Sequence, residues 1–152
     1  MTESARRPGV LHVAVVVGDD SPDASDAMRL LAAKALHGAG EVAAKASAVA
    51  VALASRLAAS PPGARRGVAV LTVPVAGLRE IRPALGVWRH CLKGVPPGHE
   101  PLQVIFVWLT PPRTSGASLP SWVRRALDDG KVVYRLKIAA TVHEALLAMG
   151  LA

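Results

Sequence analysis

Runs of consecutive apolar residues constrain this chain more than any other feature. They are rich in β-branched side chains and apolar on both faces, which is typical of strands inside a sheet that is covered on both sides. The first run is expected to lie in the middle of the sheet, and a less uniform segment, Ala84–Leu92, predicts a further strand. The strand-like runs are Val10–Val17, Gly67–Val73 and Leu102–Leu109.

Between the strand-like runs, capping residues and apolar positions three to four residues apart predict helices. Ser21 followed by Pro22 is a typical helix start, and Thr141 with Glu144 has the spacing of a capping box. The expected helices run from Ser21 to Gly38 or Gly40, and over Lys45–Ala59, Pro120–Leu127 and Thr141–Met149.

The segment Lys131–Ile138 fits two structures. Apolar residues at every second position favour a strand, whereas the spacing from Val132 and Val133 to Leu136 also fits one or two helical turns. Both alternatives stay open at this stage.

Together these elements predict an α/β fold, a single-domain mixed β-sheet flanked by helices. A chain of 152 residues with 51% apolar residues is sufficient for one core. We expect residues 1–9 to form a flexible leader and residues 10–152 to form the domain.

The cysteine content and the N-terminus indicate the compartment. Cys91 is the one cysteine, so it has no disulfide partner within the chain, and the polar N-terminus does not resemble a signal peptide. The longest apolar candidate for a membrane span begins at Ala46 and ends at Arg56, which is short of the roughly 20 residues that a span needs. We therefore expect a cytoplasmic protein with no membrane segment.

Positive charge is concentrated in the second part of the chain. Residues 51–152 contain thirteen basic and five acidic groups, within an overall net charge of +7. This asymmetry fits either a basic face that attracts anionic partners or arginines scattered over a solvated surface. Only 3% of the residues are aromatic, which argues against folds that stack nucleic-acid bases on rows of rings.

The chain lacks a phosphate loop, a dinucleotide fingerprint and a metal-binding helix motif. We therefore expect no cofactor and no metal site. The predicted strand Ala84–Leu92 would point His90 and Cys91 to opposite faces, so they would not act as a pair. Each histidine of the chain fits either a structural or a catalytic role. The histidines are His12, His37, His90, His99 and His143.

The segment from Arg56 to Leu78 resembles the IIA domain of the bacterial sugar phosphotransferase system, in its mannitol/fructose and nitrogen-regulatory class. In that family an arginine ends a helix, and a Gly-Val-Ala-Ile type of stretch leads to a Pro-His pair whose histidine carries the phosphoryl group. Here these positions hold Arg56, Gly67-Val68-Ala69-Val70 and Leu71-Thr72. Further similar segments are the helix opening at Ser21, Leu102–Leu109 with Thr110-Pro111-Pro112, Ala126-Leu127-Asp128-Asp129, and Ala139–Leu147.

The resemblance implies a IIA-like fold in which Lys131–Ile138 is helical, and it also defines three departures. Thr72 stands at the phosphohistidine position, and a threonine hydroxyl without a base is a poor nucleophile. The second active-site histidine of the family falls near Gly116 to Leu119, where this chain has none. Leu57 replaces the acidic residue that follows the arginine.

These departures indicate a degenerate IIA-like domain that acts as a regulatory protein-binding module. The expected partner is a component of the phosphotransferase system or a regulated target, and the apolar surface around Thr72, Val73 and Val75 is expected to be exposed. Arg56, Arg65 and Arg66 form either an anion-binding site beside Thr72 or a set of solvated charges.

Two alternatives remain from the sequence. An active phosphocarrier would need another histidine, with His90 or His99 the candidates. Such carriers dock the basic rim of HPr, which the excess positive charge of this chain would repel. The other alternative is a small basic nucleic-acid-binding domain, for which the chain offers neither aromatic platforms nor a recognition-helix motif.

Overall fold

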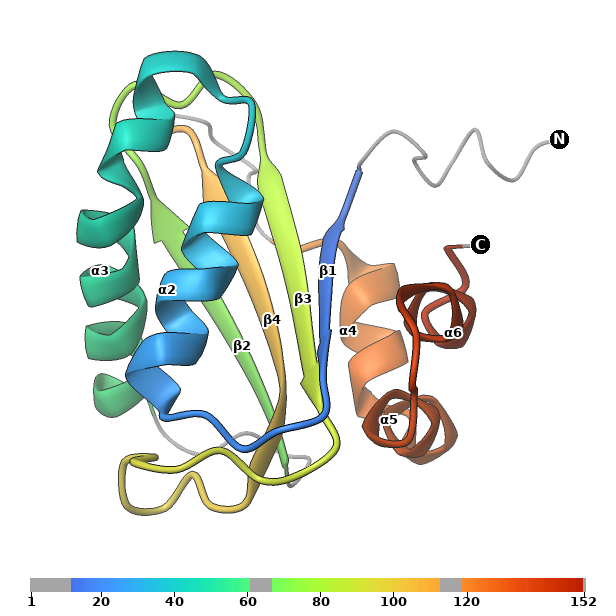
Figure 1. Cartoon of the computed structure of the whole chain (residues 1–152). Helices are drawn as coiled ribbons and strands as arrows, with labels where there is room; N and C mark the ends of the chain where they lie inside the picture. The colour runs from blue at the N-terminus through green and yellow to red at the C-terminus, as the bar shows by residue number, and fades with distance from the viewer. Residues whose placement is uncertain (1–11, 61–66, 113–118, 152) are drawn as a thin grey trace, which may run out of the picture.

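The computed structural model describes residues 12–60, 67–112 and 119–151. The helices and strands of these residues form an α/β fold, as predicted (Figure 1). In chain order the elements are β1 (Ala14–Gly18), α2 (Ala24–Ala35), η2 (Gly40–Lys45), α3 (Ala46–Ala59), β2 (Gly67–Pro74), β3 (Arg82–Trp88), β4 (Leu102–Thr110), α4 (Ser121–Asp128), α5 (Gly130–Lys137) and α6 (Val142–Ala148).

The strands form one mixed sheet in the order β1-β3-β4-β2. β1 is parallel to β3, β2 is parallel to β4, and the central pair β3 and β4 is antiparallel. Thr72 of β2 is the register partner of Trp108, whereas Gly67 at the start of β2 is the partner of Leu102. The expectation that the first strand lies in the middle of the sheet is wrong: within the described residues, β1 is an edge strand, and its residues are half-buried.

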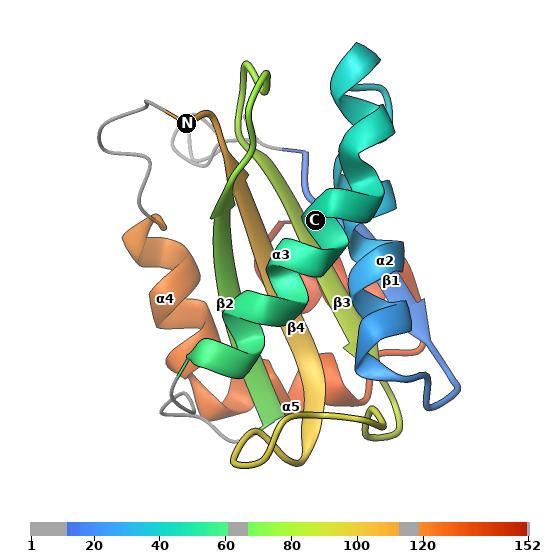
Figure 2. The ribbon, with the colours of Figure 1, turned by 90° about the vertical axis from the view of Figure 1, so that its left-hand side faces the viewer.

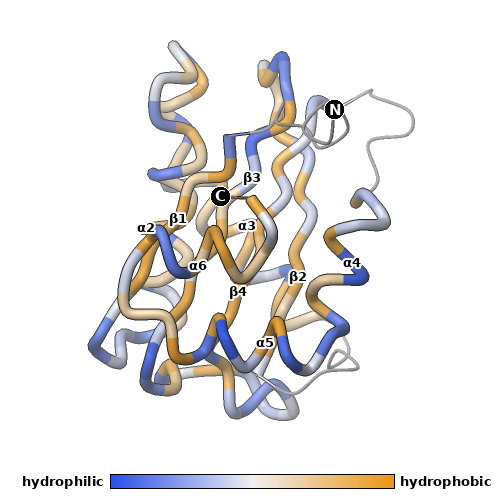
Figure 3. Tube along the Cα trace, turned by 90° about the vertical axis from the view of Figure 1, so that its right-hand side faces the viewer, coloured by the Kyte–Doolittle hydropathy of each residue, from blue (hydrophilic) through white to orange (hydrophobic). Residues whose placement is uncertain are grey.

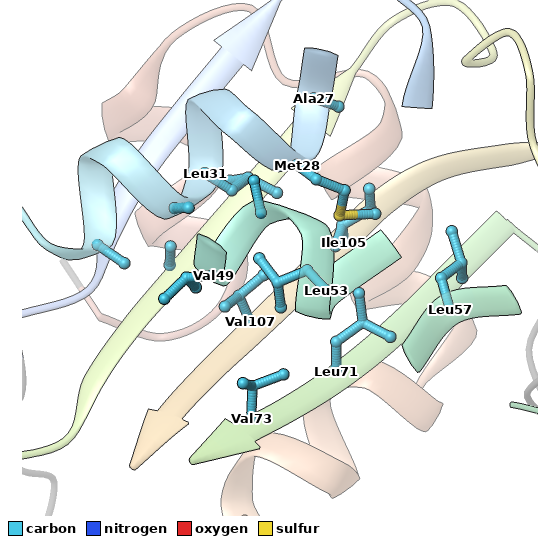
Figure 4. Packing of buried hydrophobic residues seen from close by; sticks show 14 of the residues in the cluster. Ala27, Met28, Leu31, Val49, Leu53, Leu57, Leu71, Val73, Ile105 and Val107 are labelled. Carbon is cyan, nitrogen blue, oxygen red and sulfur yellow. The ribbon is translucent and has the colours of Figure 1, made fainter. Parts of the chain in front are cut away.

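Helices α2 and α3, which the short helix η2 separates in the chain, cover one face of the sheet (Figure 2). Leu53 and Leu57 of α3 and Leu71 and Val73 of β2 belong to a single buried cluster (Figure 4). The four-residue spacing of Val49, Leu53 and Leu57 places these side chains on one side of α3, toward the sheet.

Helices α4, α5 and α6 cover the opposite face of the sheet (Figure 1). Phe106 and Trp108 of β4 point to this face, stack with their ring centroids 6.1 Å apart, and pack with Val123 of α4 and Leu136 of α5. Both faces of β4 are therefore buried, as its continuous apolar run predicts.

The segment Lys131–Ile138 is helical, as the resemblance implied. It forms most of α5, whose start is capped by the Asp129 carboxylate, which accepts a hydrogen bond of 2.8 Å from the N–H of Lys131. Val133 and Leu136, three residues apart, supply the buried face.

Two predicted element boundaries are wrong. Helix α2 begins at Ala24 and not at Ser21, because the Ser21 hydroxyl donates to the carbonyl oxygen of Cys91 instead of capping the helix. Strand β3 ends at Trp88, so His90 and Cys91 are exposed residues of the following loop and do not alternate on a strand.

The helical segment Gly40–Ala59 is long and apolar enough to cross a membrane, by length and composition alone, with a mean hydropathy of 1.5. This differs from the expectation that Arg56 ends the apolar stretch, because the segment has this length when Lys45 and Arg56 are counted within it. In the structure, the stripe of Val49, Leu53 and Leu57 packs on the sheet, as in the core helix of a folded domain.

Candidate functional site

Strand β2 presents alternate side chains to the two faces of the sheet. Ala69, Leu71 and Val73 face α3 and belong to the buried cluster on that side. Val70 and Thr72 therefore face the side of the sheet that α4 covers. Thr72 is half-buried, and Val70 is 39% exposed.

Helix α4 supplies the other wall of a hollow at Thr72. Arg124, Leu127 and Asp128 lie three and four residues apart, so they share one side of the helix. With Leu119, which precedes the helix, and Val70 and Thr72, they line a space of about 430 Å³. We call this space the Thr72 hollow.

The Thr72 hollow contains three polar side chains among the described residues that line it. Its polar groups are the hydroxyl of Thr72, the guanidinium of Arg124 and the carboxylate of Asp128, and no histidine is among the described residues that line it. A hydroxyl and a guanidinium can hold a carboxylate, a phosphate or a polar side chain of a partner. Among these described lining residues there is thus no imidazole, the nitrogen nucleophile that carries a phosphoryl group in a phosphohistidine.

The predicted anion-binding residues do not gather at Thr72. Arg56 is exposed in the last turn of α3, a helix that covers the opposite face of the sheet, and it does not line the hollow. Arg65 and Arg66 lie outside the described residues. The cation that does line the hollow is Arg124, which the sequence interpretation did not select.

The structure also differs from the expectation of an exposed apolar surface around Thr72. Val73 and Val75 are each only 4% exposed and belong to the core cluster on the α3 side, so the prediction that they form an exposed surface is wrong. Leu71 and Leu57 lie in the same cluster and do not fill the hollow.

The candidate histidines lie away from Thr72. His90 and His99 are in the loop between β3 and β4, and Leu92 of that loop donates its N–H to the carbonyl oxygen of Leu102. Leu102 pairs with Gly67 at the start of β2. Gly67 precedes Thr72 by five residues, so these two positions lie about 16 Å apart along the strand. The other histidines, His12, His37 and His143, are exposed and do not line the hollow either.

In residues 12–60, 67–112 and 119–151, no three histidine, cysteine or acidic side chains come close enough to hold a metal ion.

The fold matches solved structures of phosphotransferase-system IIA proteins. One is the nitrogen regulatory protein IIA-Ntr from Neisseria meningitidis, with 17% identity over 93% of this chain and 97% of that one, at a TM-score of 0.72. Another is enzyme IIA-mannitol from Escherichia coli, solved in complex with phosphorylated enzyme IIB-mannitol, with 12% identity over 90% of this chain and 94% of that one, at a TM-score of 0.64. No protein-family model and no curated protein sequence matches this chain.

These similarities span nearly the whole length of each protein, so the chain has the fold of a IIA domain. At identities of 12% and 17% the likeness shows the fold alone, and function depends on the residues of the site.

Proposed function

We propose that this chain is a IIA-like regulatory module of the cytoplasm that binds a protein partner and does not carry a phosphoryl group at Thr72. The observation that carries the proposal is the Thr72 hollow, an open space beside the threonine of β2 that no described histidine lines. The sequence resemblance places the phosphohistidine of IIA domains at this threonine.

Neither histidine of the alternative phosphocarrier is placed to replace the missing one. His90 and His99 belong to the loop at the other end of β2, beyond the Gly67–Leu102 pair. A phosphoryl group on either of them would be far from Thr72 and Arg124. This separation favours a binding module over a relocated phosphocarrier.

The charge around the Thr72 hollow favours an acidic protein surface as the partner. Hydrophilic residues lie along α4 and α5 (Figure 3). Four of them are exposed cations, beside the exposed carboxylates of Asp128 and Asp129, and no ion pair involving these cations is found in the described part of the chain. Rim charges of this kind speed association with an oppositely charged surface and slow it with a basic one. The cations are Arg124, Arg125, Lys131 and Arg135.

The decisive experiment is intact-protein mass spectrometry after incubation with phosphoenolpyruvate, enzyme I and an HPr-type carrier. We expect no phosphoryl adduct, while an active IIA protein in the same tube becomes labelled. An acid-labile adduct would contradict the proposal, and the His90→Ala and His99→Ala variants would then identify the acceptor.

The nucleic-acid alternative has a separate test. A gel shift with duplex DNA that weakens steeply with salt would support it, since phosphate contacts release counterions on binding. We expect no shift at physiological salt, because the sequence contains no recognition-helix motif for the groove of a duplex.

A further inference from the structure

A second and larger hollow lies on the other side of the sheet, between two loops. It has a volume of about 790 Å³, within the range of small-molecule sites. One wall is the turn after α2 together with η2, and the other is the loop that joins β2 to β3. We call it the loop hollow, and its lining residues are Gly38–Val42, Lys45, Gly77–Glu80 and Arg82.

Two cations fasten the walls of the loop hollow to each other. Lys45 of η2 donates from Nζ to the carbonyl oxygen of Ala76, at 2.8 Å, and Arg82 of β3 donates from Nη1 to the carbonyl oxygen of His37, at 2.9 Å. Carbonyl groups are neutral, so these bonds hold the two side chains in place without cancelling their charges.

Arg82 also has an unused donor. Its side chain is only 24% exposed, and its Nε is buried with no hydrogen-bond partner among the described residues. A buried unsatisfied donor is unfavourable, and it is more so on a charged group. Nη2 of Arg82 also forms an ion pair with the carboxylate of Glu80, at 3.4 Å, and the Glu80 side chain is itself 71% exposed.

The loop hollow therefore has an excess of positive charge and a polar rim. Arg79 adds a third, exposed cation, against the two exposed carboxylates of Glu41 and Glu80. Gly77 of this rim has a φ of +89°, which favours glycine, and a Cβ there would lie 3.3 Å from Val42 Cγ2.

We propose that the loop hollow binds a small phosphate monoester that also carries hydroxyl groups. The cations Lys45, Arg79 and Arg82 match a dianionic phosphate, which takes several charge-assisted hydrogen bonds. The exposed carboxylates of Glu41 and Glu80 can accept hydrogen bonds from hydroxyls. No aromatic residue is among the lining residues, so a nucleobase would have no ring to stack on.

The test is isothermal titration of the whole protein with glycerol 3-phosphate, inorganic phosphate and glycerol. We expect glycerol 3-phosphate to bind more tightly than inorganic phosphate, and glycerol not to bind. Lys45→Gln and Arg79→Gln should each lower the affinity for glycerol 3-phosphate about tenfold, as expected for the loss of one hydrogen bond to a charged group. Arg79 makes no hydrogen bond or ion pair in the described part of the chain, so its variant is expected to fold normally.

Matched controls separate this hollow from other basic sites. Arg89→Gln removes an exposed charge in the loop after β3, and Arg56→Gln removes an exposed charge at the end of α3. Both variants should leave the affinity unchanged. Equal affinities for inorganic phosphate and glycerol 3-phosphate would overturn the monoester assignment. Absence of binding, or an equal loss in the control variants, would overturn the site.

Discussion

Nε2 of His99 lies 2.8 Å from the carbonyl oxygen of Ser60 and donates its proton to it, since a carbonyl oxygen can only accept. Ser60 is the C-cap of α3, and His99 belongs to the loop between β3 and β4. The half-buried imidazole therefore fastens this loop to the end of a core helix, which is a structural role.

Replacement of His99 should reduce stability. We expect His99→Ala to lower the free energy of unfolding by about 1 kcal/mol, because one intramolecular hydrogen bond is lost. Urea denaturation measures this change. His90→Ala, at an exposed position of the same loop, is the control and should stay within about 0.5 kcal/mol of the wild type. Equal stabilities of the two variants would contradict the structural role of His99.

Introducing a histidine at Thr72 should not create a phosphocarrier. We expect Thr72→His to show little phosphoryl uptake from HPr, because no second histidine lines the hollow and the exposed cations of α4 and α5 repel a basic partner. Intact mass spectrometry with phosphoenolpyruvate, enzyme I and HPr measures the uptake, and Thr72→Ser provides the unlabelled baseline. Labelling as complete as that of an active IIA protein would show that one side chain accounts for the missing activity.

A side chain at Gly86 should destabilise the fold. The ring of Trp88 lies over Gly86, and a Cβ at Gly86 would meet Trp88 Cη2 at 2.5 Å and Leu31 Cδ2 at 3.0 Å. We expect Gly86→Ala to lower the free energy of unfolding by about 1–3 kcal/mol, because the added methyl group overpacks the core. Chemical denaturation measures the loss, and the same change made in a Trp88→Leu background should cost less. An identical cost in both backgrounds would mean that the tryptophan ring is not the obstacle.

The start of α6 depends on a side-chain cap. The hydroxyl oxygen of Thr141 accepts a hydrogen bond of 3.1 Å from the N–H of Glu144, and the Glu144 carboxylate accepts one of 2.7 Å from the N–H of Ala140. We expect Thr141→Ala to lower the free energy of unfolding by about 1 kcal/mol. Thermal or urea unfolding measures it. Thr141→Ser keeps the hydroxyl and should lose much less, so similar losses in both variants would exclude the cap as the cause.

Local patterns in the sequence predicted most elements, and the errors occur where long-range packing decides. β1 was expected to lie between two strands because both of its faces are apolar. It is an edge strand whose faces are covered by α2 and α6. Burial of both faces of a strand by helices does not require a strand on each side of it.

The candidate site was predictable in part. The resemblance selected Thr72, and the structure places it beside an open hollow. Arg124 was not selected, because its position beside Thr72 depends on how α4 docks on β2, and these segments lie about fifty residues apart in sequence, a separation that hydrophobic periodicity does not cover. Val73 was assigned to the surface although the two-residue alternation of β2 turns it toward α3, and Val75, directly after β2, belongs to the same buried cluster.

The paired bonds from Lys45 to Ala76 and from Arg82 to His37 have a dynamic consequence. The α2–η2 side supplies Lys45 and the carbonyl oxygen of His37, whereas the other side supplies the carbonyl oxygen of Ala76 from its loop and Arg82 from the start of β3. Both bonds must therefore break before the two sides separate. The space between them is therefore shaped during folding. A molecule that enters it does not bear the entropic penalty of ordering two loops, and its arrival is limited by diffusion and charge.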